Sequence, residues 1–175
     1  MSAAAGPVTS KRSLIGLGVA LAVCFVASLV GNAFTQPNLE WYATLTKPGF
    51  TPPEGVFPVV WTILFVMMAV AAWLVWRTRG DEGDKKVALV WFGIQLVLNV
   101  LWPFAFFFMH SPPFGFGVIM ALIVAIVITI VTFAKVSRNA ALLLVPYLLW
   151  VGFAAGLNFT IWVLNSGFDF GQAPS

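Results

Sequence analysis

Three apolar stretches of the chain carry aromatic rings and side-chain amides at intervals of three or four residues. Residues with this spacing share one face of an α-helix. A face that combines rings with a few amides is typical of a pocket for a flat, largely apolar ligand. The three sets are Trp61, Phe65, Met68 and Ala72; Gln95, Asn99, Trp102 and Phe106; and Trp150, Ala154, Asn158 and Trp162.

The same pattern has a second interpretation. Amide side chains inside a membrane often only hydrogen-bond a neighbouring helix, for about 0.6–2 kcal/mol. Aromatic stripes, in turn, are more often helix packing than contacts to a bound molecule. The spacing alone leaves the pocket and the packing interpretation both open.

Other kinds of chemistry have few residues available. The chain contains one histidine, His110, and one cysteine, Cys24. This excludes a protein metal cluster, haem ligation by two histidines and a disulfide within the chain. All six acidic residues lie outside the long apolar runs, unlike the intramembrane carboxylates of proton-coupled pumps. Ser28 has no nearby base to activate it. We therefore expect no metal site.

Membrane-spanning helices must position these faces. The 175 residues are 61% hydrophobic and 9% charged, whereas soluble proteins carry about 25% charged residues. Five runs without any charge each exceed the roughly 20 residues that cross about 30 Å of hydrocarbon. We predict an all-α integral membrane protein, a bundle of five transmembrane helices in one domain (13–165). The helices are expected at about 13–34, 56–76, 87–109, 114–134 and 140–164, with tails at 1–12 and 166–175.

The first run has an alternative interpretation as a secretory signal. Lys11 and Arg12 precede it, and Gly31-Asn32-Ala33 resembles a cleavage site. The apolar core of a signal is only about 7–15 residues long, so we favour an uncleaved helix.

Basic residues fall almost entirely on one side of the predicted bundle. Eight of the nine precede the first helix or lie in the second and fourth connections, and only Lys47 falls on the other side. The positive-inside rule then places the N-terminus inside and the C-terminus outside. The choice between an inner and an outer membrane stays open. Since topology accounts for these few charges, we expect a lipid bilayer and no nucleic acid as partner.

The connection 35–55 is far longer than the typical ~4–6 residues. It includes the stretch "WYATLTKPGFTPP" and four prolines, which prevent a continuous helix. Rings such as those of Trp41 and Tyr42 suit a membrane interface. The segment is therefore either an aromatic anchor at the headgroups or a semi-rigid lid over the bundle.

The stretch "GFAAG" sets Gly152 and Gly156 four residues apart. This spacing lets another helix backbone approach closely. The partner helix belongs either to the same bundle or to a second subunit.

Three blocks of the sequence, in order, resemble the signature of the translocator protein family, also called tryptophan-rich sensory proteins or peripheral benzodiazepine receptors. The blocks are "WYATLTKPGFTPP…VFPVVWTILF", "QLVLNVLWPFAFF" and "VPYLLWVGFAAGLNFTIWVLN". The resemblance covers roughly residues 28–165, and the chain's eight tryptophans fit the family's name.

The resemblance implies a five-helix bundle, commonly a homodimer, with a cavity closed by the first long loop. Family members bind protoporphyrin IX and haem, sterols, and synthetic isoquinoline and benzodiazepine ligands. By position, Trp41 and Tyr42 belong to the lid. The residues implied to line the cavity are Trp61, Phe65, Gln95, Asn99, Trp150 and Ala154.

Two departures from the family pattern indicate a bacterial type of member. Gly49-Phe50 stand where members usually carry a tryptophan, so a phenyl ring replaces one lid indole. Phe159 and Val163 occupy the tyrosine and arginine positions of the animal cholesterol motif, which argues against tight cholesterol recognition there.

Three functions are consistent with these features. The leading prediction is a membrane receptor or sensor that binds a tetrapyrrole, or a sterol-like or other flat apolar ligand, in the cavity under the first long loop. The second is an enzyme that degrades porphyrins in light, with Trp61 and Trp150 as electron donors. The third is a transporter of porphyrins or lipids.

Overall fold

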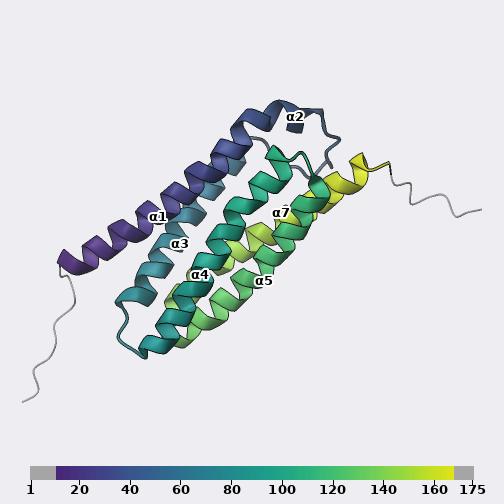
Figure 1. The fold of residues 1–175 in the computed structure, drawn as a ribbon. Helices are drawn as coiled ribbons and strands as arrows, with labels where there is room; N and C mark the ends of the chain where they lie inside the picture. Colours follow the sequence, from purple (N-terminus) through teal and green to yellow (C-terminus); the bar gives the residue numbers. More distant parts are fainter. Residues whose placement is uncertain (1–10, 168–175) are drawn as a thin grey trace, which may run out of the picture.

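Five long helices run side by side in the computed structural model, which describes residues 11–167 (Figure 1). Those residues contain no strand. The segments long and apolar enough to span a membrane are Lys11–Thr44, Val56–Arg77, Glu82–Phe108, Pro112–Val136 and Arg138–Asn165. The predicted all-α, five-helix membrane fold is thereby confirmed. The expected tails, 1–12 and 166–175, lie outside the described residues except at 11–12 and 166–167.

The spans are assembled from long helices and a few short segments. In order, the segments are α1 (Lys11–Thr35), η1 (Gln36–Asn38), α2 (Leu39–Thr44), α3 (Val56–Arg77), α4 (Glu82–Pro103), η2 (Phe104–Phe108), α5 (Pro112–Val136), α6 (Arg138–Leu143) and α7 (Val145–Asn165).

Helical structure continues well into the segment that was expected to be a loop at 35–55. After α1, the 3₁₀ turn η1 and the short helix α2 carry the chain as far as Thr44. Pro37 is compatible with this because it lies in the first turn of η1, where a missing N–H breaks no hydrogen bond. Within the segment 35–55, only residues 45–55 lack helical structure, and they form turns and irregular backbone.

The start of α4 lies five residues before the expected position, at Glu82 rather than residue 87. Asp81 caps the helix, with its Oδ1 accepting a hydrogen bond of 2.8 Å from the backbone N–H of Asp84. Glu82 and Asp84 in the first turn also favour the positive end of the helix dipole. A search for charge-free runs misses such a turn because its residues are charged.

The end of the same span widens into the π-helical turn η2. Pro103 has no N–H to donate, and the chain changes its hydrogen-bonding step just after it. The backbone N–H of Met109 then bonds the carbonyl of Phe104 at 3.0 Å, five residues back. This turn holds Phe106 and Phe107, which are both buried.

The helices form a bundle with one loosely joined side. Helix α1 packs against α3 and α4, α4 against α5, and α5 against α7. Helix α6 contacts both α5 and α3. By contrast, α3 and α7 make little close backbone contact, and a hollow lies between them.

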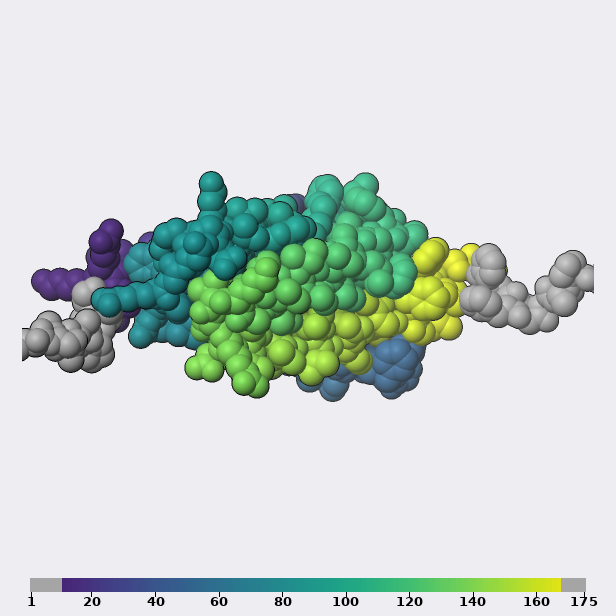
Figure 2. All heavy atoms as spheres, turned by 90° about the horizontal axis from the view of Figure 1, so that it is seen from below, coloured from purple at the N-terminus to yellow at the C-terminus, as the bar shows by residue number. Residues whose placement is uncertain are grey.

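The two ends of the bundle differ in character. The start of α1, the α3–α4 turn and the end of α5 lie together at one end (Figure 1), and the basic residues Lys11, Arg77, Lys85 and Lys135 belong to it. The opposite end carries α2 and residues 45–55. Figure 2 shows this segment in blue beside the yellow end of α7. We call residues 36–55 the cap.

Candidate ligand-binding site

A buried polar network joins α4 to α7 near the centre of the bundle. Asn99 donates a hydrogen bond of 2.7 Å from Nδ2 to the hydroxyl oxygen of Tyr147. That hydroxyl donates in turn to Oε1 of Gln95, at 2.9 Å. All three side chains are buried. The expected face residues Gln95 and Asn99 therefore hydrogen-bond across helices, as the packing interpretation predicted.

A second amide, Asn158, ties together three helices. Its Oδ1 accepts a hydrogen bond of 3.1 Å from the indole N–H of Trp102 on α4. Its Nδ2 donates to the carbonyl of Pro112 at the start of α5, at 2.8 Å. Gly115 permits this approach, because a Cβ there would lie only 3.0 Å from Oδ1 of Asn158.

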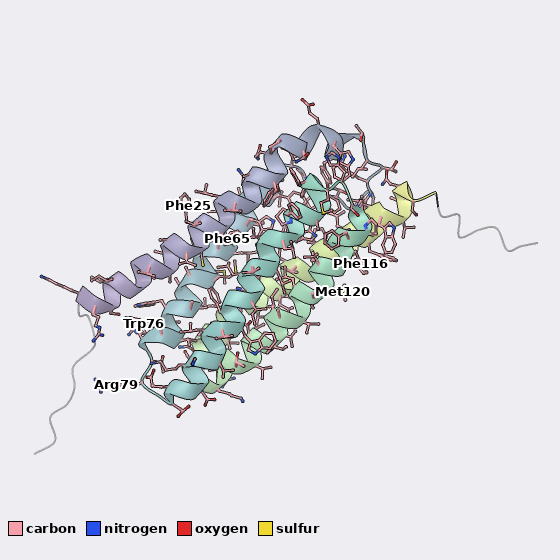
Figure 3. All side chains as sticks on the ribbon, in the orientation of Figure 1. Phe25, Phe65, Trp76, Arg79, Phe116 and Met120 are labelled. Carbon is pink, nitrogen blue, oxygen red and sulfur yellow. The ribbon has the colours of Figure 1, made fainter. Side chains whose placement is uncertain are left out.

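Aromatic side chains form a continuous wall beside these amides. The indole of Trp61 lies 5.9 Å from the ring of Phe65 and 6.4 Å from the rings of both Trp102 and Tyr147. Trp102 continues the wall to Phe106, at 5.8 Å between centroids. Phe65 lies midway along the bundle (Figure 3).

The wall extends into the cap. Trp41 and Tyr42 both pack edge-on against Phe106, with centroid separations of 5.8 and 6.2 Å. Trp41 also stacks on the imidazole of His110 at 4.4 Å, and Nε2 of His110 lies 2.9 Å from Oδ1 of Asn38. The sequence singled out Trp41 and Tyr42 but gave no role to His110.

The cap has a second attachment, at the end of α7. The amide of Asn165 accepts a hydrogen bond from the backbone N–H of Thr46 and donates one to the carbonyl of the same residue, both at 2.9 Å. Within the cap, the backbone N–H and the hydroxyl of Thr51 both bond the carbonyl of Pro48. Residues 45–55 are therefore fixed at a helix end as well as internally.

The hollow between α3 and α7 has a volume of about 420 Å³, within the usual range of roughly 300–1,000 Å³ for ligand pockets. Its lining is almost entirely apolar. The lining residues are Val60, Ile63, Leu64, Met67, Pro146, Leu149, Trp150 and Phe153.

Trp150 is distinctive in this lining. Its indole Nε1 is buried and has no hydrogen-bond partner within residues 11–167. A buried donor without a partner costs about 1–3 kcal/mol. The ring lies 5.8 Å from Phe57 and 5.4 Å from Phe153, and Phe153 contacts Phe50 of the cap at 6.3 Å. The cap thus reaches one end of the hollow.

The structure separates the expected site residues into two neighbouring groups. The wall and network contain Trp41, Tyr42, Trp61, Phe65, Gln95 and Asn99, whereas Trp150 faces the hollow. Ala154 is buried in the core. Tyr147 was missed, although it precedes Trp150 by three residues and Ala154 by seven, on the same helical face.

The glycine pair of α7 faces outward. Gly152 and Gly156 are exposed, and a Cβ on either would meet nothing within 4 Å. Their packing partner is therefore not a helix of the same chain within residues 11–167. The part of the chain that the structure describes contains no group of three or more His, Cys, Asp or Glu side chains placed to hold a metal ion.

Comparison with known proteins identifies the family. The model of the TspO/MBR family matches residues 20–163. The chain belongs to the TspO/MBR family. It is similar to the tryptophan-rich protein TspO of Chlorobaculum tepidum, with 44% identity over 156 residues, covering 89% of this chain and 99% of the relative. It is 37% identical to the human translocator protein over 153 residues, covering 85% and 87% of the two chains.

A TspO-type relative from Archaeoglobus fulgidus is 36% identical over 155 residues, covering 88% of this chain and 99% of the relative. The chain is accordingly a multi-pass membrane protein of the TspO/MBR sensor and translocator type.

Proposed function

We propose that the protein is a receptor that binds a tetrapyrrole, such as protoporphyrin IX or haem, between the cap, the aromatic wall and the hollow at Trp150. The unpartnered indole N–H of Trp150 carries the proposal. A ligand with an acceptor atom would satisfy this donor, while its flat apolar body would bury the lining of the hollow. Binding would then remove a cost that the unliganded protein bears.

Two further features support a flat ligand with acidic groups. The wall offers the faces and edges of several rings, which favour stacking on a planar molecule. Lys47 lies in the cap and forms no ion pair within residues 11–167. Its ammonium lies 4.7 Å from the centroid of Tyr42. A porphyrin propionate reaching the cap would find a positive charge there.

The replacement of Trp150 by phenylalanine tests this proposal. The phenyl ring keeps most of the apolar contact but removes the N–H, so protoporphyrin IX should bind roughly five- to tenfold more weakly, as expected for one net hydrogen bond. Affinity is measured in detergent by quenching of the protein's tryptophan emission.

Trp162→Phe is the matched control. Trp162 lies on the same helix, but its ring packs against Phe116 and Phe159 rather than the hollow. Equal affinities of the two variants would contradict the role of Trp150.

Light-driven porphyrin degradation is the alternative with a structural observation in its favour. Trp61 and Trp102 stack at an interplanar angle of 29°, and Tyr147 adjoins Trp61, so oxidisable rings adjoin one another. Illumination of the porphyrin complex in air should then bleach its absorbance faster than free porphyrin, and Trp61→Phe should slow the loss. Bleaching at the rate of free porphyrin would exclude the enzyme.

A further inference from the structure

A second hollow lies at the basic end of the bundle, far along α3 from the cap. Its volume is about 420 Å³. Trp76 near the end of α3 forms one side of this hollow, and one face of the first turns of α4 forms the other side. The lining residues are Trp76, Glu82, Lys85, Lys86, Leu89 and Val90. Figure 3 shows Trp76 and Arg79 at this end of the molecule.

Lys85 is unusually enclosed for a basic residue. Its side chain is only 14% exposed, while that of its partner Glu82 is 84% exposed. One hydrogen bond of 2.9 Å joins Nζ of Lys85 to Oε1 of Glu82. An ammonium has three donors, so two remain without a partner within residues 11–167. An enclosed cation is stabilised by a second anion, and the hollow is where such an anion fits.

Two more donors adjoin the same hollow. Lys86 forms no ion pair within the described part of the chain. The indole N–H of Trp76 likewise makes no hydrogen bond there, and the residue is 42% exposed. The six-membered ring of this indole packs on Gly16 of α1, so closely that a Cβ at Gly16 would collide with it. The ring is therefore held in place.

The lining of the hollow suits an amphiphilic ligand, with one charged and one apolar part. Leu89 and Val90 lie about two turns further along α4 than Glu82, toward the hydrocarbon. Polar donors thus stand above an apolar surface. The surrounding segment 77–86 holds four basic residues and three acidic ones, which leaves one net positive charge. Glu82 is engaged by Lys85, and Asp81 by the first turn of α4.

We propose that this hollow binds the headgroup of an anionic phospholipid, with its phosphate accepting from Lys85, Lys86 and Trp76 and an acyl chain lying along Leu89 and Val90. Basic pockets between helices at a membrane surface bind such headgroups. A free phosphate compound would share the polar contacts but would leave the apolar surface of Leu89 and Val90 uncovered. The site is independent of the tetrapyrrole site at the other end of α3.

Native mass spectrometry of the detergent-solubilised protein tests the site. Affinities are measured for phosphatidylglycerol, phosphatidylcholine and glycerol 3-phosphate. In the double variant Lys85→Gln/Lys86→Gln, phosphatidylglycerol should bind roughly ten- to thirtyfold more weakly, since each basic residue contributes about tenfold or less. Trp76→Phe should weaken it roughly two- to fivefold, as one hydrogen bond is lost.

The control is Lys135→Gln/Arg138→Gln, which removes the same charge at the same end of the bundle but outside the hollow. It should change the affinity less than about threefold. Lys86 is exposed, so Lys86→Gln alone should leave the fold intact and serves as a milder test of the same site. Thermal unfolding checks that every variant is folded.

Three results would overturn the proposal. The first is binding of phosphatidylcholine as tight as that of phosphatidylglycerol by the unmodified protein. The second is an equal loss of affinity in both double variants. The third is displacement of the lipid by an equal concentration of glycerol 3-phosphate, which would assign the hollow to a soluble phosphate compound.

Discussion

At the scale of single residues, Tyr147 holds the centre of the bundle together. Its hydroxyl accepts from Asn99 and donates to Gln95, so each partner depends on it. A buried donor or acceptor that loses its partner costs about 1–3 kcal/mol, although hydrogen bonds between membrane helices average nearer ~0.6 kcal/mol. The network therefore links helix packing to the aromatic wall through one side chain.

Tyr147→Phe should destabilise the protein by about 1–2 kcal/mol, because Gln95 and Asn99 each lose a buried partner. The measurement is the thermal unfolding midpoint in detergent. Tyr42→Phe is the control, since the Tyr42 hydroxyl makes no hydrogen bond within residues 11–167. A midpoint equally unchanged in both variants would show that the network adds no stability.

Sequence spacing identified part of this centre. Gln95 and Asn99 stand out because amides are rare in a membrane span, and both are buried. Spacing could not show that their partner is Tyr147, since a helical face identifies which residues point the same way and not which facing residue they meet. Nor could it place Trp150 in a separate hollow, because that depends on how far α3 and α7 stand apart.

At the scale of elements, the cap is held at two places of different chemistry. Stacking of Trp41 on His110 fixes its helical part, and Asn165 fixes residues 45–55 through Thr46. The cap therefore contacts the end of the third span, the turn before α5 and the end of α7 rather than resting on one helix. These contacts attach the cap to the bundle at several points.

Asn165→Ala should loosen residues 45–55 without disturbing the bundle. It removes two hydrogen bonds to Thr46, worth about 0.5–1.5 kcal/mol each. Amide hydrogen exchange in 45–55 should quicken roughly tenfold, and porphyrin should dissociate faster if the cap closes the site.

The exposed Asn139 on α6 provides the control, Asn139→Ala. If exchange in 45–55 were the same in both variants, Asn165 would not be an attachment point of the cap.

Helix ends were the least predictable elements. Charge-free runs located the five spans, because crossing hydrocarbon requires apolar length. They could not reveal that Asp81 caps α4 or that helix continues past Pro37, since both depend on local backbone hydrogen bonds. The π turn at 104–108 was equally hidden, because its phenylalanines suit an α-helix as well.

At the scale of the whole molecule, the outward face of α7 is suited to a second copy of the chain. Gly152 and Gly156 leave it free of side chains near the backbone, and helix pairs in membranes use such faces. Gly152→Leu/Gly156→Leu should shift a homodimer to monomer, as measured by cross-linking or light scattering in detergent.

Gly117→Leu is the control for this pair, since Gly117 of α5 also has nothing within 4 Å of a built Cβ. A dimer that survives the α7 changes must form through another face.

The distribution of basic residues predicts the orientation of the whole molecule. A reporter inserted at Gly83, near the α3–α4 turn, should face the cytoplasmic side, and one fused after Ser175 the opposite side. The measurement is the accessibility of each reporter to an impermeant reagent. Both reporters on one side would contradict an odd number of spans.

The π turn at Phe104–Phe108 gives the loss and the gain of a single codon different consequences. A π turn holds one more residue than the α-helical path between the same points. Deleting one residue there would let the span close as a regular helix while the segments before and after it keep their orientation. Inserting one more residue would rotate the helix before it by about 100° relative to the segment after it. Trp102 and His110 could then no longer both keep their present neighbours. Insertions in this short interval should thus be selected against more strongly than deletions or substitutions among its phenylalanines.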